Sequence, residues 1–283
     1  MFLSKDDVKK TIHKESKEIL SIKSVLGIHG KDALEGYVDE YAALSYNIYN
    51  KNDDNDSETF LHNRGWRRCE VDLNTKKGLK AQTWYKILDN DVPVIEVTLV
   101  FRGTKSLSDW IWGNLVILLD LFGHAKENSY YRQIQANLDQ WLTDIKQWIV
   151  KKVNRGGVKF KISATGHSLG GGLAQCACYC TKDISHVFTF NSSWITYYSR
   201  LVRNDWEANC KGTYILRFWE SGEVLLYLRK LVEVAYLFDT KYDSYNPRYI
   251  EYKINLTPWY IPPISSHSIH KIFKGLKTLK EIS

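Results

Sequence analysis

The sequence lacks a hydrophobic run long enough to cross a bilayer. Its longest apolar stretch, residues 110–122, contains Asn114 and Asp120 and is shorter than the roughly 20 residues that a spanning helix needs. The N-terminal segment also lacks the apolar core of a signal peptide, because lysines and acidic residues recur throughout it. We therefore expect no membrane-spanning helix and no ordinary secretion. The expected location is the cytoplasm of the producing cell, unless a specialised secretion system exports the protein.

Internal repeats and low-complexity segments are absent too, which excludes collagenous and coiled-coil proteins. Hydrophobic residues make up 44% of the 283 residues and charged residues 25%, so the chain can bury a sizeable core. We expect one domain over residues 1–283, with residues 1–50 as a helical arm packed on it. The net charge of +7 is a mild bias toward anionic partners. Nucleic acid is not expected, because the basic residues are dispersed and no base-stacking module is recognisable.

The five cysteines are an odd number, and Cys176, Cys178 and Cys180 crowd one segment. We expect reduced, buried thiols rather than disulfides. A metal cluster is the alternative, but no histidine or acidic residue lies at ligand spacing beside these three. The sequence therefore predicts no metal and no cofactor.

The hydrophobic periodicity predicts strands that alternate with helices. An apolar stripe with helical spacing predicts a helix over residues 37–48, and the polar run 50–58 is interpreted as a surface loop. Strands are predicted at residues 82–88, 92–101, 158–163, 185–190 and 213–219, and helices at residues 131–153, 173–179 and 224–237. This alternation predicts an α/β fold, in which helices flank a mostly parallel central sheet.

A G-x-S-x-G pentapeptide, Gly166 to Gly170, follows one of these strands at once and leads into a helix of small residues. Such a motif places its serine on a strained strand-to-helix turn, and the glycines at either end let the backbone fold tightly. The pentapeptide alone is weak, and a glycine-rich turn that binds a phosphate or nothing is the alternative. The strand and helix around it favour a nucleophile elbow with Ser168 as the nucleophile.

A serine nucleophile needs a histidine base, and in this fold the chain order is serine, acid, histidine. Three histidines follow Ser168. His186 begins a predicted buried strand too soon after the elbow to return to it. His267 lies in an irregular segment ahead of the last helix, and His270 lies within that helix. We predict His267 as the base, with His270 as the alternative.

Glu223 is the predicted acid, because it follows the strand at residues 213–219 after a short loop. That position places it at the carboxyl edge of the sheet, where catalytic groups collect. It would otherwise be a helix N-terminal glutamate that stabilises the helix dipole. Glu220, Asp239 and Asp243 remain alternative acids.

The run Arg102-Gly103-Thr104 ends the strand at residues 92–101 and is interpreted as an oxyanion turn. An oxyanion needs N–H donors beside the elbow, and we predict Thr104 and the N–H of Leu169 in that role. An ordinary strand end is the alternative.

Residues 107–122 are nearly unbroken apolar and are predicted to form a lid over an acyl groove, with Trp110, Ile117 and Leu118 as its key residues. A buried crossover helix is the alternative for this segment.

Five segments together resemble the class 3 (fungal-type) lipase family, including its bacterial phospholipase-like members. They are VTLVFRGT, SLSDWIWGNL, ISATGHSLGGGLA, VFTFNSS and EYAALSYNIYN. The resemblance implies an α/β-hydrolase fold, hydrolysis of carboxylic esters, lipid substrates at a membrane surface, and a lid. Ser168, Thr104 and His267 fall on matching positions. The acid departs from the family pattern, because Glu223-Val224-Leu225 stands where the family usually has a D-I-V type string.

The expected function is therefore a lipase or phospholipase that forms an acyl-enzyme on Ser168. A basic lipase-like chain without a signal peptide is also similar to toxic lipase effectors, which would imply a neutralising partner protein. Two alternatives remain open. One is a soluble carboxylesterase or thioesterase with the same machinery, and the other is a non-catalytic interaction protein that kept the fold.

Overall fold

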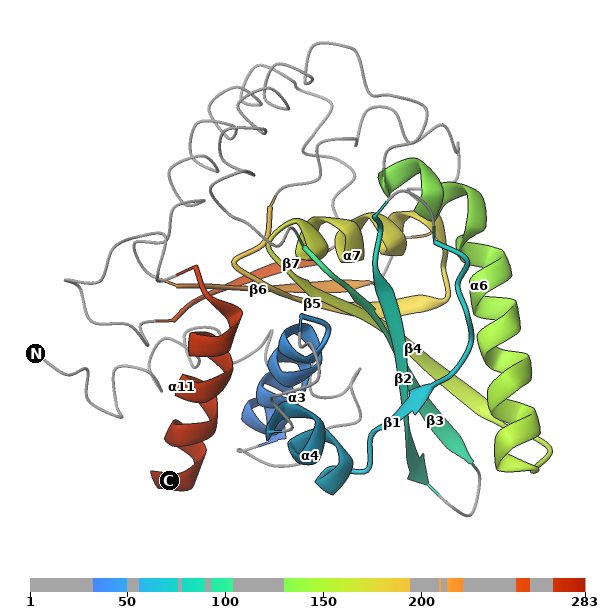
Figure 1. Cartoon of the computed structure of the whole chain (residues 1–283), viewed down its shortest axis with the longest axis horizontal. Helices are drawn as coiled ribbons and strands as arrows, with labels where there is room; N and C mark the ends of the chain where they lie inside the picture. Colours follow the sequence, from blue (N-terminus) through green and yellow to red (C-terminus); the bar gives the residue numbers. More distant parts are fainter. Residues whose placement is uncertain are drawn as a thin grey trace, which may run out of the picture.

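In the part of the chain that the structure describes, seven strands form one sheet with helices on both faces (Figure 1). The computed structural model describes residues 33–49, 56–75, 78–89, 93–103, 130–193, 209, 213–220, 248–254 and 267–282. The strands are β1 (Arg67–Cys69), β2 (Ala81–Asp89), β3 (Val94–Phe101), β4 (Lys159–His167), β5 (Ile184–Phe190), β6 (Tyr214–Glu220) and β7 (Arg248–Ile254). The helices are α3 (Ala33–Asn47), α4 (Asp56–Asn63), α6 (Tyr130–Val153), α7 (Leu169–Cys180) and α11 (Ile269–Ile282).

The strands lie in the sheet in the order in which they occur along the chain. β1 pairs antiparallel with β2, and β2 pairs antiparallel with β3. From β3 to β7 all neighbours pair parallel. A mostly parallel sheet between helices, with a strand–turn–helix unit at Ser168, confirms the predicted α/β-hydrolase fold.

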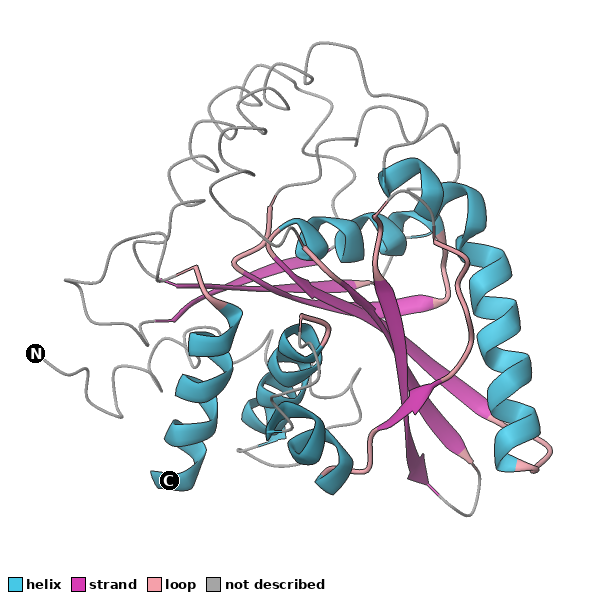
Figure 2. Cartoon of the chain, in the orientation of Figure 1, coloured by secondary structure: helices cyan, strands magenta, loops and turns pink. Residues whose placement is uncertain are grey.

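Two hydrophobic cores lie on opposite faces of this sheet. Figure 2 shows α7 on one side of the strands and α3, α4 and α11 on the other. The first core joins α6 and α7 to the sheet, and the second joins α3, α4 and α11 to it. β3 is buried along almost its whole length, as expected for a strand covered on both faces. Among the described helices, none combines the length and the apolar composition that a bilayer crossing requires.

Helix α6 matches its prediction because its apolar residues recur at helical spacing. The buried positions include Ile134, Leu138, Leu142, Ile145 and Ile149. The helix ends where Asn154 adopts the left-handed conformation with φ 51°, which asparagine tolerates better than most residues.

The interpretation of residues 50–58 as a surface loop was wrong at its C-terminal end. Helix α4 begins at Asp56, and the side chain of Ser57 is buried, where its Oγ accepts a hydrogen bond from Asn47 Nδ2 at 3.2 Å. Two carboxylates in the first turn, Asp56 and Glu58, suit the positive end of a helix dipole, so the polar composition is that of a helix N-terminus. Strands β1 and β7 were not predicted either, and the predicted helix at residues 224–237 lies outside the described residues.

Four cysteines, Cys69, Cys176, Cys178 and Cys180, are buried and form no disulfide. The expectation of buried thiols is confirmed for these four. A hydrogen bond with Cys180, together with burial, raises the pKa of Cys176 well above its usual value, so its thiol is protonated and unreactive.

Tyr41 is the centre of a buried polar network between α3 and the sheet. Its hydroxyl donates to Glu96 Oε1 at 2.6 Å and lies 2.9 Å from both Ser163 Oγ and His186 Nε2. Burial lowers the pKa of His186, which favours its neutral form. The network holds α3 on the sheet and occupies His186 in a structural role, in agreement with its exclusion as a catalytic base.

We expect Tyr41→Phe to lower the free energy of unfolding by about 1–3 kcal/mol, because it removes one hydroxyl from several buried polar partners. Urea unfolding followed by circular dichroism measures the change. Tyr37→Phe, one helical turn earlier and only half buried, is the matched control and should cost less. Equal effects of the two variants would contradict the central place of Tyr41.

Candidate active site

The carboxyl ends of the parallel strands meet at one edge of the sheet, and the predicted catalytic residues follow these ends. Phe101 at the end of β3 lies opposite Gly166, and His167 at the end of β4 lies opposite Phe190. β6 ends at Glu220 beside the end of β7. Ligands and catalytic groups of open α/β sheets collect at this edge.

Ser168 occupies the turn between β4 and α7 in a strained conformation, with φ 58° and ψ −128°. Among the described residues, four that are not glycine have positive φ, and the other three are asparagines, Asn74, Asn154 and Asn191. Asparagine tolerates this region, whereas serine seldom adopts it. Strain of this kind is typical of functional sites and confirms the geometry that the G-x-S-x-G motif predicts.

The backbone N–H and carbonyl of Ser168 both form hydrogen bonds, whereas its side-chain hydroxyl forms none with the described residues. Its N–H donates to the carbonyl of Phe190 at 3.1 Å, and its carbonyl accepts from the N–H groups of Gly171 and Ser193 at 3.0 Å each. Serine is a favoured N-cap, yet its side chain makes no capping bond to α7. The buried Oγ makes no hydrogen bond with any described residue, so it is available for chemistry.

The glycines of the motif allow backbone contacts that no side chain would permit. A Cβ on Gly170 would lie 2.2 Å from the carbonyl oxygen of Phe101, and one on Gly166 would lie 2.4 Å from the carbonyl group of Gly170. A Cβ on Gly103 would lie 2.6 Å from the Tyr49 hydroxyl and 2.7 Å from the carbonyl oxygen of His167. Gly166 and Gly170 therefore have the role predicted for them, and Gly103 packs the end of β3 onto the elbow.

The structure brings the predicted base, His267, to the elbow. Its side chain is buried, its ring centroid lies 4.7 Å from that of His167, and its carbonyl oxygen lies 2.5 Å from His167 Nε2. His167 is the residue directly before Ser168. The alternative base, His270, lies on α11 with its ring 5.0 Å from that of Tyr46.

Two residues at this site were missed by the sequence analysis, His167 and Tyr49. The Tyr49 hydroxyl accepts a hydrogen bond from the N–H of Gly103 at 2.8 Å and lies 3.5 Å from His167 Nδ1. Burial and the nearby His267 hold the pKa of His167 well below its usual value. Both residues lie inside segments that resemble class 3 lipases, His167 in ISATGHSLGGGLA and Tyr49 in EYAALSYNIYN, but nothing in their spacing indicated a contact.

Of the predicted oxyanion donors, Leu169 is the first residue of α7, and its N–H lies at the positive end of the helix dipole. Thr104 lies outside the described residues, as do Glu223, Trp110, Ile117, Leu118 and the whole segment 107–122. The alternative acid Glu220 is described. It is buried at the end of β6, where its N–H donates to Asn191 Oδ1 at 2.7 Å.

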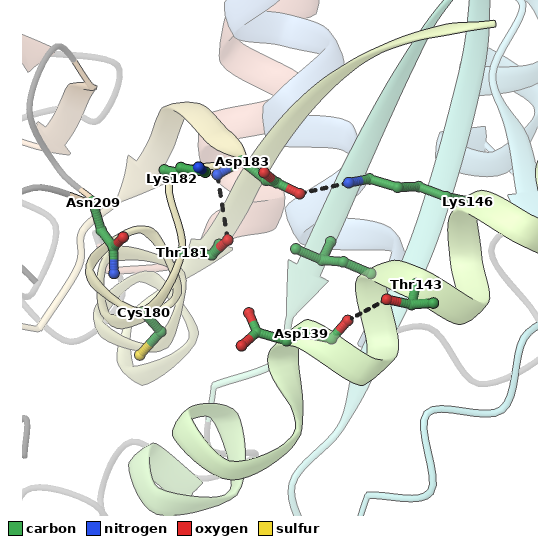
Figure 3. Close-up of a pocket in the computed structure, with 9 residues that line it drawn as sticks. Asp139, Thr143, Lys146, Cys180, Thr181, Lys182, Asp183 and Asn209 are labelled. Atoms are coloured by element: carbon green, nitrogen blue, oxygen red, sulfur yellow. Dashed lines mark hydrogen bonds and ion pairs between the residues drawn. The ribbon is translucent and has the colours of Figure 1, made fainter. Parts of the chain in front are cut away.

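A separate polar pocket with a volume of about 410 Å³ lies at the opposite end of α7 (Figure 3). Asp139, Lys182 and Asp183 line it, and Asp183 Oδ2 lies 2.5 Å from Lys146 Nζ. Its lining continues to Cys180, the last residue of α7, whereas Ser168 immediately precedes the first. The pocket is unsuitable as an acyl groove, because charged side chains line it and it lies at the end of α7 away from Ser168.

The sheet and the elbow together give this chain the α/β-hydrolase fold, with a serine at the position of the nucleophile motif. Residues 98–204 match the family model of lipases described as Lipase (class 3). The resemblance to class 3 lipases is therefore confirmed over this segment, which contains the end of β3, the elbow and Ser193. The match supports a hydrolase of the lipase type.

Several solved structures are similar to this chain. Lipase II from Rhizopus niveus is 17% identical, with 72% of this chain and 77% of that chain covered and a TM-score of 0.40. Est1E from Butyrivibrio proteoclasticus is 11% identical, with 77% and 98% covered and a TM-score of 0.32. An esterase of Pyrococcus furiosus is 13% identical, with 77% and 93% covered and a TM-score of 0.33. No curated protein matches the sequence significantly.

We expect Gly170→Ala to lower the free energy of unfolding by about 1–3 kcal/mol, because the added methyl group would overlap the backbone of β3. Thermal melting measures the change. Gly156→Ala is the matched control, because nothing lies within 4 Å of a Cβ at Gly156. A Gly170→Ala protein as stable as the control would contradict the close contact at the elbow.

Proposed function

We propose that the protein is a serine hydrolase that cleaves carboxylic esters of lipids, with phospholipids as the substrate class. The observation that carries this proposal is Ser168. It lies on a strained elbow with a hydroxyl that caps nothing, within a segment that matches class 3 lipases. Structural serines at helix N-termini use their hydroxyl as a cap, so this arrangement favours a nucleophile.

In the proposed mechanism, Ser168 Oγ attacks the ester carbonyl while His267 takes the hydroxyl proton. The N–H of Leu169 and the Thr104 residue stabilise the oxyanion of the tetrahedral intermediate. His267 then gives its proton to the leaving alcohol, and an acyl-enzyme remains on Ser168. Water, activated by the same histidine, releases the fatty acid. Glu223 orients His267 and stabilises its charged form, with Glu220 as the alternative.

The lipid substrate class rests on residues 107–122 and on the net charge. In the sequence, this apolar segment begins after residues 102–106, which contain the predicted oxyanion turn and follow the end of β3. As a lid, it would cover the acyl groove in water, and Trp110, Ile117 and Leu118 would contact the lipid surface. The net charge of +7 favours approach to anionic membranes. If the protein is an exported effector, a neutralising partner protein in the producing cell follows as part of this proposal.

We expect Ser168→Ala and His267→Ala each to lower ester turnover by at least about a thousandfold, because nucleophile and base act as one unit. Fatty acid release from phospholipid vesicles and hydrolysis of a short soluble ester are measured in parallel for both variants and for the wild type. If the wild type hydrolyses the short ester but not the phospholipid vesicles, the soluble esterase is favoured. A Ser168→Ala variant that hydrolyses these esters as fast as the wild type would contradict the proposal.

The acid is tested by Glu223→Gln and Glu220→Gln, which remove a charge and keep the shape of the side chain. If Glu223 orients the base, its variant should lose about a hundredfold or more in kcat at an unchanged melting temperature. Glu220→Gln should mainly lower the melting temperature, because Glu220 is buried at the end of β6. If Glu220→Gln loses kcat at an unchanged melting temperature and Glu223→Gln does not, Glu220 is the acid that orients the base.

A further inference from the structure

A chain of hydrogen-bonding groups runs across the elbow from the end of β3 to the segment that carries the base. It begins at the N–H of Gly103, which donates to the Tyr49 hydroxyl at 2.8 Å. The hydroxyl lies 3.5 Å from His167 Nδ1. The other nitrogen of the same ring, Nε2, lies 2.5 Å from the carbonyl oxygen of His267. Four segments that are distant in the sequence thus meet through the side chains of Tyr49 and His167.

The directions of these hydrogen bonds are mutually consistent. A carbonyl oxygen only accepts, so His167 Nε2 carries the proton that it donates to His267. In the neutral ring Nδ1 is then an acceptor. The Tyr49 hydroxyl accepts from Gly103, and its one proton faces two acceptors of His167 at 3.5 Å each, Nδ1 and the backbone carbonyl oxygen, so either bond joins Tyr49 to His167. Burial keeps His167 neutral, which avoids a second positive charge beside His267 when the latter is protonated.

We propose that His167 is a positioning residue, which anchors the backbone of the base His267 at the elbow and joins it, through Tyr49, to the strand end that leads into the oxyanion turn. This inference rests on the proposed function. The base lies in a turn just before α11, and its ring reaches Ser168 productively only if its backbone is held. His167 holds it from the position next to the nucleophile, so that nucleophile and base share one anchor.

The alternative is a histidine that only fills the core. A core-filling residue acts through its volume, whereas a positioning residue acts through the donor at Nε2. His167→Phe keeps an aromatic ring, slightly larger than imidazole, and removes the donor. His167→Gln places an amide N–H near the position of Nε2. Tyr49→Phe removes the hydroxyl that joins Gly103 to His167.

The test measures kcat and KM on a short soluble ester, the rate at which a fluorophosphonate labels Ser168, and the melting temperature. We expect His167→Phe to lower kcat and the labelling rate by about 30- to 100-fold with KM unchanged, since small displacements of a catalytic group are costly. His167→Gln should recover to within about fivefold of the wild type, and Tyr49→Phe should lose about fivefold to tenfold. His62→Phe is the control at a histidine away from the elbow. His62 lies on α4, on the opposite face of the sheet from α7, and its Nδ1 lies 3.0 Å from the carbonyl oxygen of Trp66.

If the wild type is active and a folded His167→Phe protein keeps the wild-type kcat and labelling rate, the positioning role of His167 is overturned. The proposed function is not affected by that result. If His167→Phe does not fold, a wild-type kcat in Tyr49→Phe combined with no recovery in His167→Gln would overturn it as well. A wild type that reacts with neither the ester nor the fluorophosphonate would overturn the proposed function, and this role with it.

Discussion

The position of the nucleophile depends on the contact between Gly170 and the carbonyl group of Phe101. No side chain fits there, since a Cβ would lie 2.2 Å from the oxygen, so the first turn of α7 touches the end of β3. Within the motif, a Cβ on Gly166 would likewise lie 2.4 Å from the carbonyl group of Gly170. This packing places the N-terminus of α7, with its partial positive charge, beside the strand end that leads to the oxyanion turn. The strain at Ser168 is the consequence of a turn that must close within this space.

A second constraint comes from α3, which lies along β4 in register with it. Three side-chain pairs follow one another at regular intervals. Tyr41 and Ser45 on α3 pair with Ser163 and Thr165, and Tyr49, in the turn just after α3, pairs with His167. Each step is four residues on the helical side, about 6.0 Å, and two residues on the strand, about 6.6 Å. The near match of the two repeats lets one face of the helical segment pair with one face of the strand. The fully buried Tyr41 network at one end thereby sets the place of Tyr49 at the elbow.

The sequence predicted the elements whose signal is local. The helical stripe of α6, the alternation at the start of β4 and the glycine motif all depend on residues close in the chain, and each was found. β7 and α4 were missed, because polar residues interrupt β7 (RYIEYKI) and α4 has eight residues with few apolar ones. His167 and Tyr49 were missed for another reason. Their contacts join residues 100 and 118 positions apart, which no pattern of spacing reveals. The predicted acid and lid lie outside the described residues, so they stay predictions.

The three functions left open by the sequence differ in what they require of Ser168. A protein that only binds a partner has no need of a serine with φ 58°, and strain of this kind costs about 1–3 kcal/mol. A glycine at this position would relieve the strain, and a capping hydroxyl would partly offset it, yet the chain has neither. The buried histidine pair beside the elbow adds a further cost, because it removes polar rings from water. These costs are understandable if they position a nucleophile and its base, and they favour a hydrolase over an interaction protein.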